Sequence, residues 1–199
     1  MAFTYNSGGK VTGNSSASPI QFNYTAGSNS KLVVLTICHI GASPTAVGTP
    51  TYDSNNMSQV DQLRSSQEGG TEIWYYLSPV AESKQISIPN SAADTITYTC
   101  SDYTNASYDA SYDTGNGADN GDAADVPASV TSTEALEGVC VTCMTHGEKD
   151  QFSSITNGTS LHATPSIDEG SVQSGAAYSI ESLAGSQAVT PLSAPLPVS

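Results

Sequence analysis

Two cysteines three positions apart, Cys140 and Cys143, form a CxxC motif. Such a motif can be half of a zinc site or a redox pair. A zinc site needs a second pair of ligands at suitable spacing, which the sequence lacks, and a thioredoxin-like pair needs a following helix. Here the context EGVCVTCMT predicts a strand, in which positions i and i+3 face opposite sides. We therefore expect free, mostly buried cysteines that pack as small apolar residues. A disulfide between strands, such as Cys38 with Cys100, is the alternative.

Two of the three histidines, His39 and His146, occur near the ends of two similar segments. VVLTICHIG (Val33–Gly41) and VCVTCMTHG (Val139–Gly147) align without gaps and share a valine, a threonine and a glycine. Equivalent central strands of one sandwich would explain the similarity, and chance would explain it nearly as well. With an Asp or Glu, the two histidines could bind a metal. The favoured interpretation is strand-end histidines that touch solvent or bond a backbone carbonyl.

An acidic segment, Asn105–Ala128, contains almost no large apolar residue except Tyr108, Tyr112 and Val126. A loop of this length in a compact domain is usually functional or mobile. Calcium takes about six to eight oxygen ligands from carboxylates, carbonyls and water. The side chains that could supply them are Asp113, Asn116, Asp119, Asn120, Asp122 and Asp125. Their spacing does not match an EF-hand, so a solvated loop is the default expectation and calcium binding is the alternative. No other cofactor is expected.

The chain carries no GxSxG, HExxH, Walker-type or GxGxxG motif. Paired carboxylates for glycoside hydrolysis depend on geometry and usually accompany several aromatic residues in a cleft. The chain has a single tryptophan, Trp74. We therefore expect a protein that is not an enzyme.

Trp74, Tyr75 and Tyr76 are consecutive in one predicted strand. Trp74 and Tyr76 share one face of that strand, and Tyr75 takes the other. One interpretation is a platform on which a sugar stacks. The favoured interpretation is an aromatic strand that fills the core of a sandwich.

The charge is strongly acidic, with 19 Asp and Glu against 5 Lys and Arg and a formal net charge of -14. It argues against nucleic acid, because phosphate binding needs clustered cations. It also argues against anionic membrane surfaces. Two explanations of the acidity stay open: a saline environment in which carboxylates keep the surface hydrated, and solubility through mutual repulsion.

No segment reaches the roughly 18 apolar residues that a membrane-spanning helix requires. The N-terminal MAFTYNSGG lacks the basic start and apolar run of a secretory signal. We expect cytoplasmic synthesis without cleavage, after which the protein could reach the outside by lysis or as part of a virus particle.

Strand-like segments recur along the chain, and helical periodicity is nearly absent, which predicts an all-β fold. The expected strands are 20–25, 31–40, 49–52, 58–63, 71–77, 84–88, 95–103, 138–145, 151–154, 161–164, 172–182 and 188–192. The continuous apolar run Leu32–Leu35 predicts a central strand covered on both faces. The alternation in Ile96–Tyr103 predicts a strand with one face in water.

The expected organisation is a single β-sandwich domain, residues 19–192, with the acidic insertion at 105–128. It lies between an N-terminal arm, residues 1–18, and a Pro-rich C-terminal arm, residues 193–199. Proline removes a donor from the hydrogen-bond ladder, so this C-terminal segment should not join the middle of a sheet.

Several segments together resemble a known layout. They are LVVLTICHIG, TPTYDSNNMSQV, TEIWYYLSPVAESKQISI and TITYTCSDY, followed by Val139–Thr145 and Ala176–Leu183. The layout is similar to that of jelly-roll-like β-sandwich modules of phage and environmental surface proteins, over Ile20–Leu192. The resemblance implies an antiparallel, jelly-roll-like sandwich displayed on a particle or surface, without active-site residues. Its loops and termini would make the contacts, and the insertion at 105–128 is where this chain departs from the layout.

The resulting hypothesis is a non-enzymatic structural subunit of a virus particle: a capsid decoration, turret or tail-associated protein located in the virion. Its partners would be other virion or assembly proteins and further copies of itself. The expected contact residues are Phe3, Tyr5, Tyr108, Tyr112, Pro195 and Pro197. One alternative is a carbohydrate-binding or adhesin module at a cell surface, which would bind a glycan through Trp74 and the loop tyrosines, with or without calcium. Another is a self-assembling extracellular filament subunit.

Overall fold

The computed structural model consists of strands and turns, with no helix, in the residues that it describes. These are 4–5, 11–39, 45–65, 69–92 and 94–104, followed by strand segments from residue 128 to residue 195. The strands of the first part are β1 (Thr4–Tyr5), β2 (Val11–Ser15), β3 (Ile20–Thr25), β4 (Ser30–His39), β5 (Thr51–Tyr52), β6 (Asn55–Asn56), β7 (Ser58–Ser65), β8 (Gly69–Leu77), β9 (Ser83–Ile88) and β10 (Ile96–Thr104). No described segment is a helix long and apolar enough to cross a membrane.

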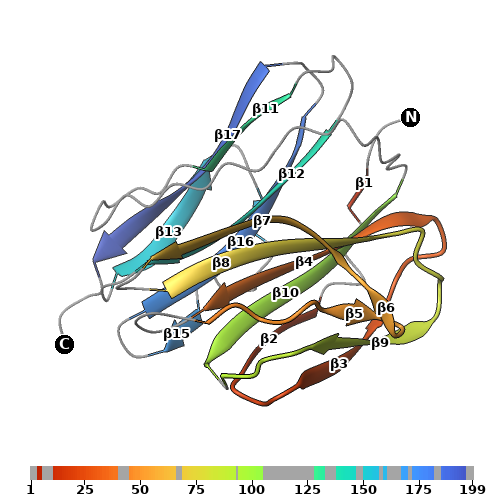
Figure 1. Cartoon of the computed structure of the whole chain (residues 1–199). Helices are drawn as coiled ribbons and strands as arrows, with labels where there is room; N and C mark the ends of the chain where they lie inside the picture. The colour runs from red at the N-terminus through yellow and green to blue at the C-terminus, as the bar shows by residue number, and fades with distance from the viewer. Residues whose placement is uncertain are drawn as a thin grey trace.

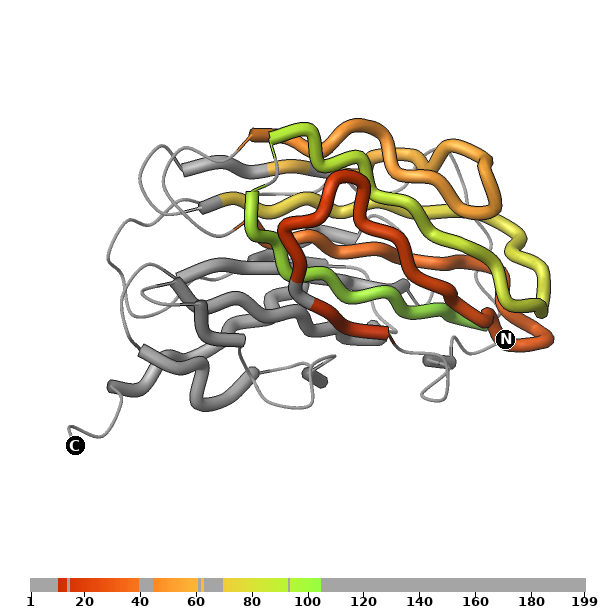
Figure 2. Tube along the Cα trace, turned by 90° about the horizontal axis from the view of Figure 1, so that it is seen from below, coloured from red at the N-terminus to blue at the C-terminus, as the bar shows by residue number. Residues whose placement is uncertain are grey.

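Two antiparallel sheets of this first part pack face to face (Figure 1). Sheet I has the order β1–β10–β4–β8–β7, and β2 also pairs with β10. Sheet II has the order β3–β9–β5–β6. Figure 2 follows the chain as it leaves β2 in sheet I, turns, and returns as β3 in sheet II. The prediction of an all-β, antiparallel sandwich is confirmed for this part of the chain.

The central strand β4 is covered on both faces, as its apolar run predicts. Val33, Leu35 and Ile37 belong to the core shared with sheet II. The alternate residues Val34 and Cys38 are also buried, at 5% and 2% exposure, although they point away from that core. A strand buried on both faces is expected to have a nearly continuous apolar sequence, and LVVLTIC fits this pattern.

The prediction that Ile96–Tyr103 has one face in water is wrong. In β10 the inward residues Ile96 and Cys100 are buried, and so are the opposite-face residues Thr97, Thr99 and Ser101. The reason is that a second layer covers this face: β16, from the second part of the chain, lies against β10. Buried threonines keep their hydroxyls satisfied through the backbone, as when Thr36 Oγ1 of β4 donates to the Thr99 carbonyl oxygen at 3.3 Å.

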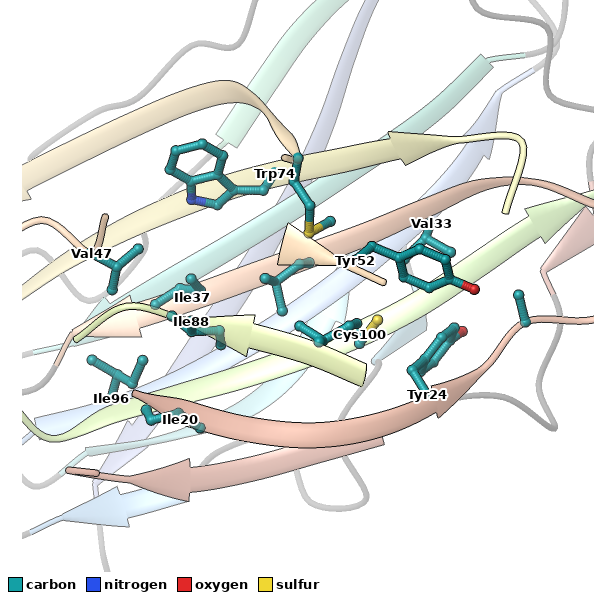
Figure 3. Close-up of a cluster of buried hydrophobic side chains, with 14 residues drawn as sticks. Ile20, Tyr24, Val33, Ile37, Val47, Tyr52, Trp74, Ile88, Ile96 and Cys100 are labelled. Atoms are coloured by element: carbon teal, nitrogen blue, oxygen red, sulfur yellow. The ribbon is translucent and has the colours of Figure 1, made fainter. Parts of the chain in front are cut away.

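Aromatic and β-branched side chains from both sheets fill the core (Figure 3). Tyr24 and Tyr52 lie at one end of it, and Val47 and Ile96 lie toward the other. Trp74 is 6% exposed and belongs to the same cluster. The interpretation of the aromatic strand as a core strand is therefore confirmed.

The second part of the chain adds further antiparallel strands. They are β11 (Ala128–Ser132), β12 (Gly138–His146), β13 (Asp150–Thr156), β14 (Thr159–Ser160), β15 (Ile167–Glu169), β16 (Val172–Glu181) and β17 (Gly185–Pro195). One sheet has the order β12–β16–β14, with β15 also paired to β16, and another has the order β11–β17–β13. Strand β12 lies against β4 and β8 of sheet I, and β16 lies against β4 and β10. The expected strand 161–164 falls outside the described residues.

The two similar segments of the sequence both form strands, in different positions. Val33–His39 lies in β4, which pairs with β10 and β8. Val139–His146 lies in β12, which pairs with β16 alone among the described strands. The segments are thus not equivalent central strands of one sheet.

Both ends of the chain contribute strands. In the segment expected to be an N-terminal arm, β1 and β2 extend one edge of sheet I. At the other end, β17 continues to Pro195. Residues 185–189 of β17 pair with β11, and residues 190–195 pair with β13. Pro191 and Pro195 therefore lie where β17 has one neighbour among the described strands, which is where a strand tolerates proline.

Candidate functional site

The core of the sandwich contains a buried hydrogen-bonded pair, His39 and Glu72. His39 is the last residue of β4, and Glu72 lies on β8 directly opposite Ile37. His39 Nε2 and Glu72 Oε1 are 2.8 Å apart, and both side chains have 0% exposure. Both residues share the inward face with Ile37 and Trp74, because alternate residues of a strand share a face.

Glu72 accepts two further hydrogen bonds. Trp74 Nε1 donates to Oε2 at 3.0 Å, and the backbone N–H of Val47 donates to Oε1 at 3.2 Å. Three donors therefore converge on one carboxylate, which compensates for the cost of burying its charge. Through these bonds Glu72 connects β4, β8 and the segment 45–50.

A histidine next to a carboxylate can act as an acid–base pair, but it must be able to reach a substrate. Here neither side chain is exposed to solvent. His39 Nδ1 is buried and has no hydrogen-bond partner. In the part of the chain that the structure describes, no three potential metal ligands come together. The arrangement is that of a structural network rather than a reaction centre.

The predicted surroundings of His39, either solvent or a backbone carbonyl, are therefore wrong. It neither touches solvent nor relies on a backbone carbonyl, because Glu72 occupies its Nε2 atom. The metal alternative requires His39 and His146 to lie close together. His39 faces sheet II, whereas β12, which ends at His146, lies against sheet I. His162 is outside the described residues.

A second buried carboxylate, Asp102 of β10, lies at the other end of the core. Tyr24 Oη donates to Asp102 Oδ1 at 2.6 Å, and the backbone N–H of Gly27 donates to Oδ2 at 3.0 Å. Asp102 has 0% exposure. Because Tyr24 lies on β3, this bond joins sheet II to sheet I directly.

Ionisable groups near Asp102 are held in their neutral forms. Burial raises the pKa of Tyr52 from 10.0 to about 12, and the nearby Cys100, Asp53, Tyr76 and Asp102 add to the shift. Burial also raises the pKa of the Cys100 thiol well above its usual range, helped by the Asp102 carboxylate. A reactive cysteine needs a depressed pKa. Cys100 is thus an inert core thiol, as the sequence predicts for a free buried cysteine.

The prediction of free cysteines is wrong for Cys38. Cys38 is disulfide-bonded, and Cys100 is free, so the suggested pairing of Cys38 with Cys100 is also wrong. The expected strand context of the CxxC motif is confirmed, because Cys140 and Cys143 both lie in β12.

At the surface, Lys84 of β9 makes a small charged cluster. Its Nζ lies 3.1 Å from Asp53 Oδ2 and 3.4 Å from Glu82 Oε2. The hydrogen bond to Asp53 is the main reason that the pKa of Lys84 is raised. The cluster fastens the β5–β6 turn to β9.

Of the six residues predicted to make contacts, the structure describes Tyr5 and Pro195. Tyr5 lies in β1 opposite Tyr103, and Pro195 ends β17 opposite Asp150. Phe3, Tyr108, Tyr112 and Pro197 lie outside the described residues, as do the calcium candidates Asp113, Asn116, Asp119, Asn120, Asp122 and Asp125. Trp74 is buried and bonded to Glu72, so it is not accessible for stacking on a sugar.

Both buried carboxylates were missed from the sequence, although one signal was present. In TEIWYYL, Glu72 has the same parity as Trp74 and Tyr76, which places an acidic side chain on the face assigned to the core. An acidic residue on a core face requires partners. One partner, Trp74, lies on the same strand, and the others come from β4 and from segment 45–50. Only the folded register identifies the partners on other segments.

Comparison with known proteins gives no family: no family model, curated protein or solved structure matches this chain.

Proposed function

We propose that this protein is a non-enzymatic structural subunit of a virus particle, with a jelly-roll-like β-sandwich as its scaffold. The observation that carries the proposal is the use of its buried polar groups. His39, Glu72, Trp74, Tyr24 and Asp102 direct their polar atoms at one another and at the backbone, across strands and between sheets. These hydrogen bonds hold the strands and the two sheets in fixed positions. A rigid scaffold suits a subunit that carries mechanical load or displays a surface.

Assembly would use sheet edges and chain ends. An edge strand presents backbone N–H and C=O groups that can pair with a strand of another chain. Among the described strands, β7 pairs only with β8 at one edge of sheet I, and β3 pairs only with β9 at one edge of sheet II. The contact residues Phe3, Tyr5, Pro195 and Pro197 belong to the chain ends, and Tyr108 and Tyr112 belong to the acidic insertion, as proposed from the sequence.

The test is electron microscopy of the native material with antibodies raised against the purified chain. Regular labelling of particle surfaces supports the proposal, and labelling of filaments supports a filament subunit instead. Light scattering of the purified chain over a wide concentration range provides the second measurement. A chain that stays monomeric and is absent from every particulate fraction overturns the proposal.

A further inference from the structure

The disulfide of Cys38 requires a partner among the other cysteines of the chain. The chain has four cysteines, of which Cys38 is disulfide-bonded and Cys100 is free. The remaining two, Cys140 and Cys143, both lie in β12, and β12 lies against β4, the strand that carries Cys38. We propose that Cys38 forms its disulfide with one cysteine of the CxxC motif, so that β4 and β12 are covalently joined.

The position of Cys38 within β4 supports this assignment. Val33, Leu35 and Ile37 point to sheet II, so Cys38, with the opposite parity, points to the other face of sheet I. That is the face against which β12 lies, since sheet II covers the first. Cys100 has the parity of Ile96, which belongs to the same core as Val33, and is thus on the wrong face for Cys38.

Cys38 can bond to only one of the two cysteines of the CxxC motif. Positions three apart in an extended strand lie on opposite faces, so Cys140 and Cys143 are not interchangeable as its partner. The same geometry keeps the two from bonding to each other while β12 remains extended. The motif would therefore act as a structural attachment point with one thiol left over, and not as a redox pair.

Forming this link removes two protons and two electrons from two thiols. A low-molecular-weight disulfide or molecular oxygen accepts them, being reduced to two thiols or to a peroxide, respectively. Such bonds persist in oxidising surroundings and are rare in the reducing cytosol. The link would therefore be most stable outside a reducing compartment.

The link closes a loop on the order of 100 residues that includes the whole acidic segment. A cross-link of this span restricts the unfolded chain and so stabilises the folded one. For a domain of this size, we expect reduction to lower the thermal midpoint by roughly 10 °C.

Peptide mapping under non-reducing conditions tests the assignment. The intact protein is alkylated first, to block free thiols, and is then digested. Trypsin alone leaves residues 85–149 in one piece, because no Lys or Arg lies between Lys84 and Lys149. A second protease that cleaves at Asp and Glu separates Cys100 from Cys140 and Cys143. A peptide containing Cys38 linked to Cys140 or Cys143 confirms the proposal. An alkylated Cys38, a link to Cys100 or a link between Cys140 and Cys143 overturns it.

Serine variants provide an independent measurement. Cys38→Ser and one of Cys140→Ser and Cys143→Ser should each melt about 10 °C lower and become insensitive to reductant. The other CxxC variant and the control Cys100→Ser should keep a midpoint that reductant lowers. If Cys100→Ser abolishes the reductant effect, or if the wild-type midpoint ignores reductant, the proposal fails.

Discussion

At the scale of single residues, two buried carboxyl groups connect strands and sheets through hydrogen bonds. Glu72 accepts from His39 Nε2, Trp74 Nε1 and the Val47 N–H, and Asp102 accepts from Tyr24 Oη and the Gly27 N–H. Burying a carboxylate is costly unless donors surround it, and breaking such a network costs more than the pair contributes in isolation. These two residues should therefore be among the most sensitive positions of the sandwich.

Substitution of Glu72 tests this directly. Glu72→Ala leaves three buried donors without an acceptor, and we expect it to lower the free energy of unfolding by about 3–5 kcal/mol. Glu72→Gln keeps one acceptor oxygen and should cost about 1–3 kcal/mol. Urea unfolding followed by Trp74 fluorescence measures both changes. The exposed Glu82→Gln is the matched control and should change stability little. A loss below about 1 kcal/mol for Glu72→Ala would show that the network is not structural.

The raised pKa of Tyr52 predicts that the free energy of unfolding falls at alkaline pH. Its pKa is 10.0 in the unfolded chain and about 12 in the folded one, so between these values the folded state retains a proton that the unfolded state releases. Its contribution to stability is complete below pH 10 and is lost as the pH rises through 12. Urea unfolding between pH 9 and 12 measures the slope. Tyr52→Phe should make the slope less steep, although Cys100 and Tyr98, whose pKa values are also raised, still contribute to it. An unchanged slope in that variant contradicts the assignment.

The sequence indicates the aromatic core but not the polar network, for a physical reason. Alternation within one strand places Trp74 and Tyr76 on a common face, and both pack in the core. The network depends on which residues of other strands come opposite Glu72. The register of the strands and the path of segment 45–50 determine these residues. The local sequence pattern encodes neither of them.

At the scale of elements, strand identity follows from local pattern, and strand environment does not. The apolar run of β4 identifies a strand covered on both faces, whereas the alternating β10 is equally buried. Threonine and serine in β10 form a polar stripe that would suit solvent, but neighbouring strands cover it. Alternation reports the two faces of a strand and says nothing about what lies against the second one.

The β5–β6 hairpin offers a test of backbone strain. Its two turn residues, Asp53 and Ser54, have φ values of 49° and 65°, in the left-handed region that favours glycine. Ser54→Gly relieves this strain, and we expect the free energy of unfolding to rise by about 0.5–1 kcal/mol. The same change at Ser83, in strand β9, should instead destabilise. Equilibrium unfolding in urea compares the two variants, and a loss of stability in Ser54→Gly contradicts the expectation.

At the scale of the whole molecule, charge and connectivity act together. The chain carries 19 acidic and 5 basic residues. Among the described residues, the buried carboxylates Glu72 and Asp102 accept hydrogen bonds from nearby donors. The other carboxylates repel one another, which favours solubility and opposes compaction. A cross-link between β4 and β12 would oppose that repulsion by holding the two parts of the chain together.

Salt dependence separates the two explanations of this acidity. Raising NaCl from about 0.01 M to about 1 M shortens the screening length from about 30 Å to about 3 Å. If the fold depends on a saline environment, the thermal midpoint should rise by several degrees and then level off as repulsion is screened. Thermal unfolding by circular dichroism measures the midpoint. Sucrose at matched osmolality is the control, because it favours compact states without screening charge. An equal rise in sucrose, or a midpoint that ignores NaCl, would mean that the acidity serves solubility alone.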